Sequence, residues 1–411
     1  MDPPTPQRRA LAAQASGRSP GLLPLLGGIN LLGAMALDAY LPAFSAIERA
    51  LSATPIQMQQ TLSAYFIGFG IANLVAGTLA DAIGRRPVIL AGVLLNALAF
   101  IACAGVQTTG QLVAMRFIQG VACSAAVSVT LAVMRDVYDP HEMQEAMTRL
   151  MALLVLGPIL APALGGWLLV TLGWRGLFGV MGLMALALVA ATAYRLPETL
   201  ATSARQALYL QDFVHSYRKA FSGWRFIMLS LAFSAGFNGV FLYVLAAPVY
   251  LGVHLGLDPA AYYLAFAAVA VVTGLLAATL RQVTRGQPMQ RRVYWGLGVM
   301  LLAGVINLLA NWAWPAQISW SLWPIAACAA GFVLAAPRIQ VLALDVFPDH
   351  RGLSSALQAT WVALTNAAVA GLLIPIAMHT PTHLAGASML MISIGFCAWL
   401  LSQRPTTDRP A

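Results

Sequence analysis

Residues 21–43 read GLLPLLGGINLLGAMALDAYLPA, and this stretch contains a single charged side chain, Asp38. A bilayer core of about 30 Å is crossed by roughly 20 apolar residues in a helix, which satisfies its own backbone hydrogen bonds. The stretch is too long for the apolar core of a signal peptide, and it carries an acid within it. It therefore predicts a retained membrane-spanning helix.

The rest of the chain shares this apolar character. Of its 411 residues, 60% are hydrophobic and only 9% are charged, whereas soluble proteins carry roughly 25% charged residues. We therefore predict an all-α membrane protein of twelve transmembrane helices. Cutting the sequence at its charged, Pro-rich and Gly-rich breaks places these spans at 21–43, 57–80, 88–107, 111–135, 145–170, 175–196, 225–251, 258–281, 292–313, 318–342, 352–378 and 383–402.

One long polar interruption, residues 197–224, separates the first six spans from the last six. It predicts two six-helix bundles, at 21–196 and 225–402, joined by a central cytoplasmic loop. Residues 1–20 and 403–411 are expected to be cytoplasmic tails. Two pseudo-symmetric bundles around a cavity at the membrane midplane are typical of transporters that alternate between two openings.

The basic residues predict the orientation, because cytoplasmic loops carry an excess of Lys and Arg. With the N-terminus in the cytoplasm, 20 of the 23 Lys and Arg side chains lie inside, two (Arg49 and Arg175) lie outside, and Arg116 falls within a span. We therefore expect both termini to lie in the cytoplasm. The net charge of +9 also suggests that the protein could bind a nucleic acid. The basic residues are scattered between apolar runs, however, and form no single patch, so none is expected.

Asp38 and Arg116 are the main candidates for chemistry. An ionisable group inside a span costs roughly 2.5–3.5 kcal/mol on the insertion scale, so it is a functional candidate by default. Each lies about five residues below the predicted outer surface, and at about 1.5 Å per residue the two would sit at similar depth. Arginine stays protonated, whereas burial and a nearby cation shift a carboxyl pKa in opposite directions. Asp38 is therefore predicted to exchange protons beside Arg116, and the alternative is a static pair that tethers two spans.

The loop between the second and third spans contains Asp81, Arg85 and Arg86, flanked by Gly77 and Gly84. The two glycines predict a tight turn with close helix contact. A carboxylate there would face the N-terminal dipole of a helix in the other bundle and latch one conformation, which is a gating role. The alternative is the ordinary positive charge of an inner loop, which accounts for the arginines alone.

The fifth span combines Gly157, Pro158, Pro162, Gly165 and Gly166. Proline and glycine in one membrane helix predict a kink and a thin face for close packing. A simple bend without a functional role is the alternative.

Binding cavities are mostly apolar with a few polar groups. Deep polar and aromatic residues are therefore candidates to line the substrate cavity, although each could equally be a hydrogen bond between helices. They are Asn30, Tyr40, Tyr65, Gln119, Asn238, Phe241, Tyr243, Gln358 and Asn366.

Several signals are missing from the sequence. It contains no GxxxxGK[ST] phosphate loop, no HExxH motif and no catalytic constellation. The four cysteines lack the spacing of a zinc site or a disulfide framework. We expect no cofactor, no metal and no enzymatic activity, which leaves secondary transport.

Several of these motifs also resemble those of a known family. Asp38–Pro42 (DAYLP), Gly77–Arg86 (GTLADAIGRR), Arg116–Gly120 (RFIQG) and Ala161–Gly166 (APALGG) are similar to elements of the major facilitator superfamily, and within it of the Bcr/CflA drug-resistance group. The second motif departs at Ala82, where a basic residue is usual. The resemblance covers nearly the whole chain and is strongest in its first half.

The resemblance implies a proton antiporter that exports small organic molecules or drugs by alternating access. It places Asp38 and Arg116 in proton coupling, Gly77 to Arg86 in gating, and Gly157 to Gly166 in the antiporter motif. A dedicated exporter of one siderophore, nucleoside or amino acid shares all these motifs and stays open as an alternative. An uptake symporter is a third possibility and a membrane-embedded enzyme a fourth. We expect a monomer whose partners are protons, the small-molecule substrate and the lipid bilayer.

Overall fold

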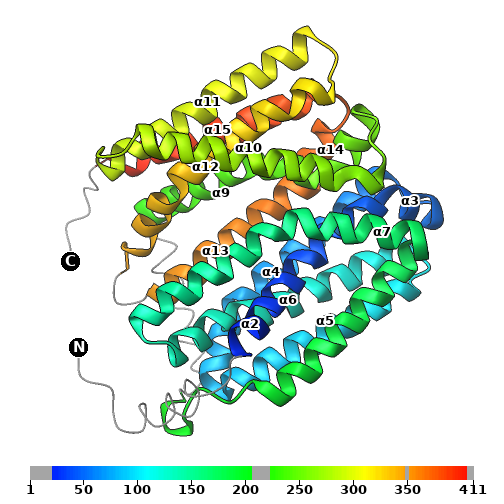
Figure 1. Cartoon of the computed structure of the whole chain (residues 1–411), viewed down its shortest axis with the longest axis vertical. Coiled ribbons are helices and arrows are strands. Elements are labelled where there is room, and N and C mark those ends of the chain that lie inside the picture. Colours follow the sequence, from blue (N-terminus) through cyan, green and yellow to red (C-terminus); the bar gives the residue numbers. More distant parts are fainter. Residues whose placement is uncertain (1–20, 206–222, 348–350, 405–411) are drawn as a thin grey trace. The chain divides into compact units, whose positions relative to one another are not determined.

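All the regular secondary structure in the described residues is helical, without a β-strand among them (Figure 1). The structure is a computed structural model that describes residues 21–205, 223–347 and 351–404. The tail predicted at 1–20, most of the predicted central loop and most of the second tail lie outside these residues. Contacts between residues divide the chain into two units, which we call the N-terminal and C-terminal units.

The N-terminal unit holds the described residues up to Ser52 and those from Ala64 to Arg205. In this unit α5 packs against α6 and α7, and α2 packs against α6 and α7. Its elements are α2 (Leu22–Asp38), the 3₁₀ turn η1 (Leu41–Ala43), α3 (Phe44–Leu51), most of α4 (Pro55–Ile83), α5 (Arg85–Gly105), α6 (Thr109–Val137), α7 (Pro140–Arg195) and η2 (Thr202–Ala204).

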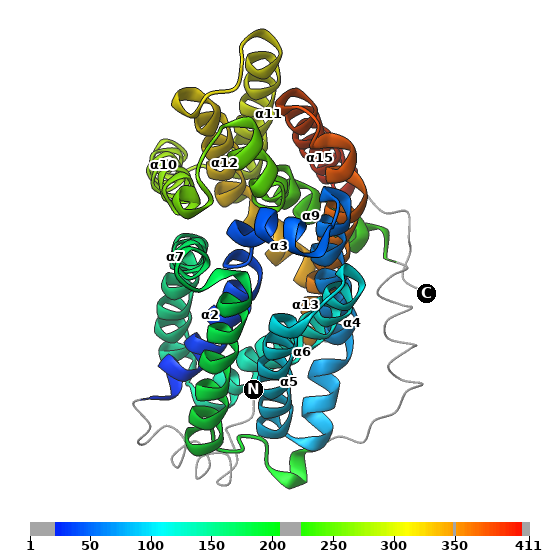
Figure 2. The same ribbon diagram turned by 90° about the vertical axis from the view of Figure 1, so that its right-hand side faces the viewer.

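The C-terminal unit holds Ala53–Ser63 and the described residues from Gly223 onwards. In this unit α9 packs against α15, and α10 and α11 each pack against α12 (Figure 2). Its elements are α9 (Trp224–Leu245), the π-helical η3 (Pro248–His254), η4 (Pro259–Ala261), α10 (Tyr262–Val283), α11 (Met289–Ala313), α12 (Ile318–Leu344), α13 (Arg351–Ala368), the π-helical η6 (Val369–Leu373), α14 (Ile374–Ala377) and α15 (Pro381–Ser402).

The start of α4 differs from the prediction that residues 21–196 form one bundle. Ala53–Ser63 belongs to the C-terminal unit. Gln59 donates a side-chain hydrogen bond to the Leu245 carbonyl at 3.1 Å, and Ser63 donates one to the Ala367 carbonyl at 2.9 Å. The first turns of α4 are therefore fixed by polar contacts to α9 and α13, which the hydropathy of the segment does not reveal.

The predicted all-α membrane fold is confirmed. Eleven helices among the described residues are long and apolar enough to cross a membrane. One of them, Gly157–Arg195, covers the second half of the fifth predicted span and nearly all of the sixth. Helix α7 runs through both spans and leaves helical geometry at Gly173, where φ is 70°. Residues 171–174, predicted as the break between the fifth and sixth spans, contain this bend. The chain is a multi-pass membrane protein.

The first span is longer than its predicted range and is interrupted at Asp38. Helix α2 ends at this residue, η1 follows, and α3 continues to Leu51. Pro42 lies four residues after Asp38 and has no amide hydrogen, so it cannot donate the helical hydrogen bond to the Asp38 carbonyl. Asp38 thus lies at a break inside the span.

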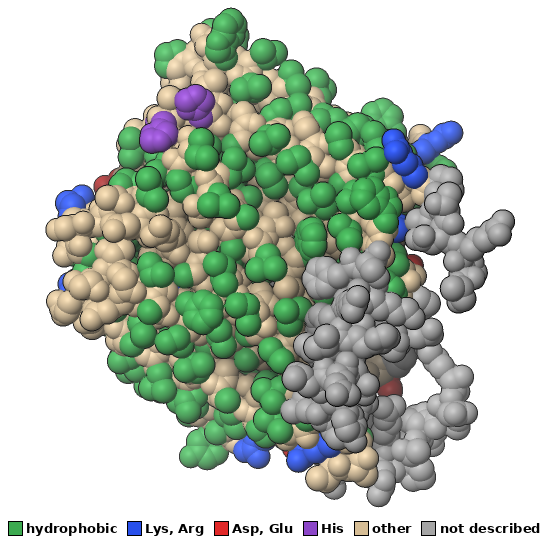
Figure 3. All heavy atoms as spheres, turned by 180° about the vertical axis from the view of Figure 1, so that it is seen from behind, with side chains coloured by type: hydrophobic (Ala, Val, Ile, Leu, Met, Phe, Trp, Pro, Cys, Tyr) green, Lys and Arg blue, Asp and Glu red, His purple; other side chains and the backbone are tan. Residues whose placement is uncertain are grey.

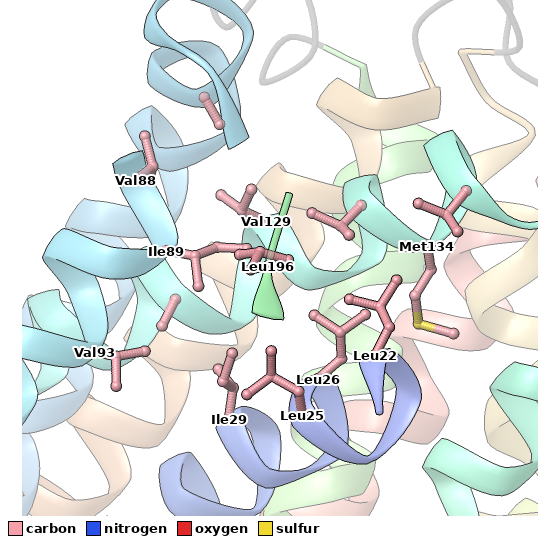
Figure 4. Close-up of a cluster of buried hydrophobic side chains, with 14 of the residues drawn as sticks. Leu22, Leu25, Leu26, Ile29, Val88, Ile89, Val93, Val129, Met134 and Leu196 are labelled. Carbon is pink, nitrogen blue, oxygen red and sulfur yellow. The ribbon is translucent and has the colours of Figure 1, made fainter. Parts of the chain in front are cut away.

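Apolar side chains from four segments form one core of the N-terminal unit. Figure 4 shows Leu26 of α2, Ile89 of α5, Val129 of α6 and Leu196 pointing into this cluster. All four are at most 2% exposed. Within lipid these contacts gain dispersion energy and shape complementarity more than hydrophobic free energy, since lipid tails are as apolar as leucine.

The surface of the helices is apolar as well. Large side chains such as Val170, Leu183 and Ile376 are mostly exposed. Figure 3 shows hydrophobic side chains over most of the visible face, with the Lys and Arg side chains near its edge. Such a surface is stable against hydrocarbon and unfavourable in water.

Candidate functional site

Arg116 lies inside the N-terminal unit on α6, a helix with a well-capped N-terminus. Helix α6 begins with a capping box, in which Thr108 and Gln111 each accept a hydrogen bond from the other's backbone N–H. Two turns later the helix places Arg116 in the interior, where its side chain has no exposed surface. A charge in this position needs polar partners that the protein itself provides.

Four groups surround the Arg116 guanidinium. Its Nη1 donates to the Ala36 carbonyl at 2.8 Å and to Gln119 Oε1 at 2.6 Å. Its central carbon lies 4.5 Å from the ring centroid of Tyr40 and 5.0 Å from that of Tyr65. Each such cation–π contact contributes about 0.5–2 kcal/mol, most when desolvated. Its Nε and Nη2 are buried with no acceptor among the described residues, so the cation retains unused donors.

Asp38 is buried in the same neighbourhood. Asp38 is 6% exposed, and its Oδ1 has no hydrogen-bond partner among the described residues. Asp38 lies two residues from Ala36 and two from Tyr40, and both of these contact Arg116. No ion pair joins Asp38 to Arg116 in the described part of the chain, so the direct contact that the sequence allowed is not formed here. An acceptor on Asp38 and donors on Arg116 are both left without partners.

The helical turn that carries Asp38 is contacted from two sides. Arg116 of α6 bonds to the Ala36 carbonyl, and Gly165 of α7 lies against the Ala39 carbonyl. A Cβ atom at Gly165 would come within 2.0 Å of that oxygen, so only glycine permits this approach. Helices α6 and α7 therefore both contact the last turn of α2, which ends at Asp38.

Tyr65 is fixed by the close crossing of α4 and α6. A Cβ atom at Gly120 would lie 1.9 Å from the Tyr65 carbonyl, and one at Gly68 would lie 2.2 Å from the Phe117 carbonyl. The two backbones are in direct contact there, as is common where small residues meet in membrane helices. The Tyr65 hydroxyl also donates to the Gly33 carbonyl at 3.3 Å. The ring beside Arg116 thus has little freedom to move.

The other members of the Gly/Pro segment play weaker structural parts. Helix α7 keeps helical backbone angles through Pro158 and Pro162, and its break lies further along at Gly173. Pro158 is exposed, while Pro162 and Gly166 are buried. A Cβ atom at Gly157 would make ordinary contact with Ala34 at 3.5 Å. The predicted thin face is therefore centred on Gly165, and the residue of α7 with non-helical backbone angles is Gly173 and neither proline.

The loop between α4 and α5 forms a charged network within the N-terminal unit. Asp81 pairs with Arg85 at 2.6 Å, and Arg85 Nε reaches Asp136 Oδ2 at 3.3 Å. Arg86 donates to the Ala193 carbonyl at 2.7 Å. The arginines predicted for this loop are therefore held by groups at the ends of α4, α6 and α7.

A carboxylate does cap a helix N-terminus here, but it is Glu198. Its Oε1 accepts from the Arg85 backbone N–H at 3.0 Å, at the start of α5. Gly84 precedes this residue with φ of +112°, and a Cβ atom there would lie 2.3 Å from Glu198 Oε2. Gly84 thus makes the predicted tight turn and close contact. Gly77 differs, since no described atom lies within 4 Å of its virtual Cβ.

The predicted cavity residues fall into separate groups. In the N-terminal unit Tyr40, Tyr65 and Gln119 surround Arg116, whereas Asn30 bonds to the Leu26 carbonyl of its own helix at 2.8 Å. This group lies at the break of α2. Asn30 therefore satisfies its donor locally and does not join the cluster.

In the C-terminal unit Asn238 of α9 donates to Asn366 of α13 at 2.7 Å. Tyr243 accepts from Asn307 at 2.7 Å, and Phe241 stacks on Phe237 with centroids 4.7 Å apart. The first two contacts join different helices, as the alternative of interhelical hydrogen bonding predicts.

Gln358 is 3% exposed, and its Nε2 has no acceptor among the described residues. Asn238 Oδ1 is likewise buried without a donor. Neutral amides with unused hydrogen-bonding capacity are therefore present in the C-terminal unit.

Sequence reasoning assigned no role in these sites to four contributors. They are the Ala36 carbonyl, the packing glycines Gly68 and Gly120, and Glu198. A backbone acceptor carries no sequence signal, and glycines are frequent in membrane helices. Glu198 stands in the segment LPETL directly after the sixth span, and its position beside a helix end was the available clue.

Comparison with known proteins gives several similar sequences. A bicyclomycin resistance protein homolog from Haemophilus influenzae is 28% identical over 381 residues, covering 90% of this chain and 92% of that protein. The multidrug resistance protein MdtL of Shewanella oneidensis is 27% identical over 340 residues, covering 83% and 85%. A chloramphenicol resistance protein of Pseudomonas aeruginosa is 29% identical over 296 residues, covering 71% and 69%.

Solved structures share the fold at low sequence identity. A D-xylose-proton symporter superposes with a TM-score of 0.70 at 17% identity, covering 93% of this chain and 96% of that one. The POT family transporter PepTSo gives a TM-score of 0.72 at 12% identity, covering 94% and 99%. The family model described as Major Facilitator Superfamily matches residues 26–370. The chain therefore belongs to the major facilitator superfamily, a family of membrane transporters of small molecules.

Proposed function

We propose that the protein exports small organic molecules, drugs among them, from the cytoplasm in exchange for protons. The relatives named for resistance to bicyclomycin, chloramphenicol and multiple drugs support export of such molecules. The observation that carries the coupling is that buried Asp38 has an unused acceptor, while buried Arg116 has unused donors and bonds to the Ala36 carbonyl, two residues before Asp38. Leaving such groups unpaired costs about 1–3 kcal/mol each, and more when they are charged, so an alternative arrangement that pairs them is favoured.

In the proposed cycle Asp38 takes up a proton when the site opens to the outside and releases it towards the cytoplasm. Ionised Asp38 attracts the Arg116 cation, which then leaves the Ala36 carbonyl. Asp38 lies on the same helical turn as the Ala36 carbonyl, to which Arg116 donates, and the Ala39 carbonyl, which Gly165 contacts. A change in the charge of Asp38 is thereby transmitted to α6 and α7, whose movement accompanies alternating access.

The substrate is proposed to interact with Tyr40, Tyr65 and Gln119 in the N-terminal unit. Apolar and aromatic walls with few polar groups accommodate many organic molecules, as in other ligand cavities. We further propose that the protein resides in the bacterial inner membrane with both termini in the cytoplasm. Gly77 to Arg86 are proposed to control gating.

The test is transport in proteoliposomes with an acidic interior and chloramphenicol or bicyclomycin outside. The wild-type protein is expected to accumulate the drug as protons leave. Asp38→Asn cannot change its charge, so drug entry should fall to the level of protein-free vesicles. Glu145→Gln removes an exposed acid that is 68% accessible and pairs with Arg149. This control should transport normally, and full pH-driven accumulation by Asp38→Asn would refute the assignment.

A further inference from the structure

A groove in the C-terminal unit has no part in the proposed cycle. It encloses about 840 Å³ between α10 and α11, and α12 forms its floor. Figure 2 shows α12 between α10 and α11, and both helices pack against it. Its lining is apolar or aromatic except for Gln317, and it includes the side chains of Trp314, Trp320 and Trp323.

The lining follows helical periodicity on all three helices. Val272 and Leu276 are four residues apart on α10, while Ile306 and Ala310 are four apart on α11. Ala327 follows Trp323 by four residues on α12. Residues at this spacing share one helix face, so three faces converge on the same space. The groove is therefore a regular feature of the packing and does not arise from one misplaced side chain.

The groove opens on an exposed apolar surface of the C-terminal unit. Helix α10 is the least enclosed candidate span, with 6% of its most apolar window buried. Ile306, Trp314 and Trp323 are 50%, 65% and 46% exposed. None of the described residues that line the groove is charged. Tryptophans gather at one end, where α11 passes to α12, and tryptophan is enriched where hydrocarbon meets water.

The length of the groove matches one leaflet of a membrane. Its α11 wall runs from Ala303 to Trp314, which at about 1.5 Å per residue is roughly 16 Å. Half of a hydrocarbon core of about 30 Å is roughly 15 Å. An acyl chain that starts at the tryptophan end therefore fills the groove and ends near the midplane.

We infer that the groove binds one acyl chain of a phospholipid. This phospholipid belongs to the leaflet nearest the connection between α11 and α12. Under the proposed topology this is the outer leaflet. Empty space between helices forfeits dispersion contacts, and a long flexible chain restores them. Thr273 tethers α10 to α12 by a bond to the Ala326 carbonyl at 3.2 Å. The lipid supplies the missing side contact between α10 and α11, and it is recognised by its chain and not by its headgroup.

The first experiment is native mass spectrometry of the full chain released from mild detergent after incubation with dipalmitoyl phosphatidylcholine. The wild type should retain one phospholipid. Ile306→Trp and Leu276→Trp place a large ring in the groove from opposite walls and should each lose it at least tenfold. Leu309→Trp, on the exposed face of α11 outside the lining, is the matched control and should retain it.

The second experiment measures the melting temperature of delipidated protein. Dipalmitoyl phosphatidylcholine and phosphatidylglycerol should each raise it by several degrees, since a ligand that binds the fold stabilises it. Dihexanoyl phosphatidylcholine should have no effect. Ile306→Trp should melt at or above the delipidated wild type and gain nothing from lipid, because its own ring occupies the groove.

Four results would overturn the inference. They are wild-type protein that retains no phospholipid, retention by both groove variants at the wild-type level, displacement of the lipid by chloramphenicol, and a dimer that Ile306→Trp dissociates. The last two would assign the groove to a drug or to a second copy of the chain. None of these outcomes depends on whether Asp38 couples transport to protons.

Discussion

At the scale of single residues, the site depends on how Arg116 is bound more than on its charge alone. The guanidinium lies against two tyrosine rings and donates from one nitrogen to both Ala36 and Gln119. A planar group can stack on rings and donate in several directions at once, which a lysine ammonium cannot do. The side chain therefore positions α2 as well as providing a positive potential.

Arg116→Lys is expected to reduce drug transport in proteoliposomes at least tenfold. Lysine keeps the charge but loses the stacking on Tyr40 and Tyr65 and the forked donor geometry. Arg149→Lys, in an exposed pair with Glu145, is the control and should transport at the wild-type rate. Near-normal transport by Arg116→Lys would mean that charge alone suffices.

The sequence identified the important residues of this site but did not predict how they are arranged. Asp38 and Arg116 stood out because charge inside a span is costly, and that argument needs no structure. Their arrangement did not follow, because the interruption of α2 depends on Pro42 and the main partner of Arg116 is a backbone carbonyl. Hydropathy reports how apolar a segment is, and it gives no information on which carbonyl a buried donor will reach.

At the scale of helices, close crossings fixed by glycine hold the site together. Gly120 of α6 lies on α4 beside Tyr65, and Gly165 of α7 lies on the end of α2 beside Asp38. In both cases the neighbouring atom is a backbone oxygen, which cannot move aside as a side chain does. Gly77 of α4 has open space instead, and composition alone did not distinguish it from the other two.

Gly120→Ala is expected to destabilise the protein by about 1–3 kcal/mol, the usual cost of overpacking. The added methyl group would force α4 and α6 apart and displace the Tyr65 ring from Arg116. Gly77→Ala is the matched control, because it adds the same group to a helix with nothing in its way. Thermal unfolding in detergent should show a lower melting temperature for Gly120→Ala only, and equal melting of the two variants would contradict this packing.

Asp81→Asn is expected to slow drug turnover while leaving the apparent affinity within a few-fold of wild type. Asp81 is 41% accessible at its side chain, so its pair with Arg85 contributes little stability. Arg85 keeps its contact with Asp136 in this variant. Initial rates over a range of drug concentrations separate the two effects, and a large loss of affinity at normal turnover would refute a gating role.

At the scale of the whole molecule, the sequence predicted the class of protein and most helix positions. Spans such as 88–107 and 383–402 lie within a few residues of α5 and α15. The sequence did not predict that the bend lies at Gly173 or that Ala53–Ser63 groups with the C-terminal unit. The first depends on one backbone angle and the second on hydrogen bonds to Leu245 and Ala367, which lie far along the chain.

The central claim is that substrate and protons move in opposite directions through a site built on Asp38. The most direct measurement loads proteoliposomes with chloramphenicol, dilutes them into drug-free medium at equal pH, and follows the internal pH with a trapped dye. As the drug leaves faster than from protein-free vesicles, the interior should become acidic, and Asp38→Asn vesicles should show no change. Protein-dependent drug efflux with constant or rising internal pH would contradict the account.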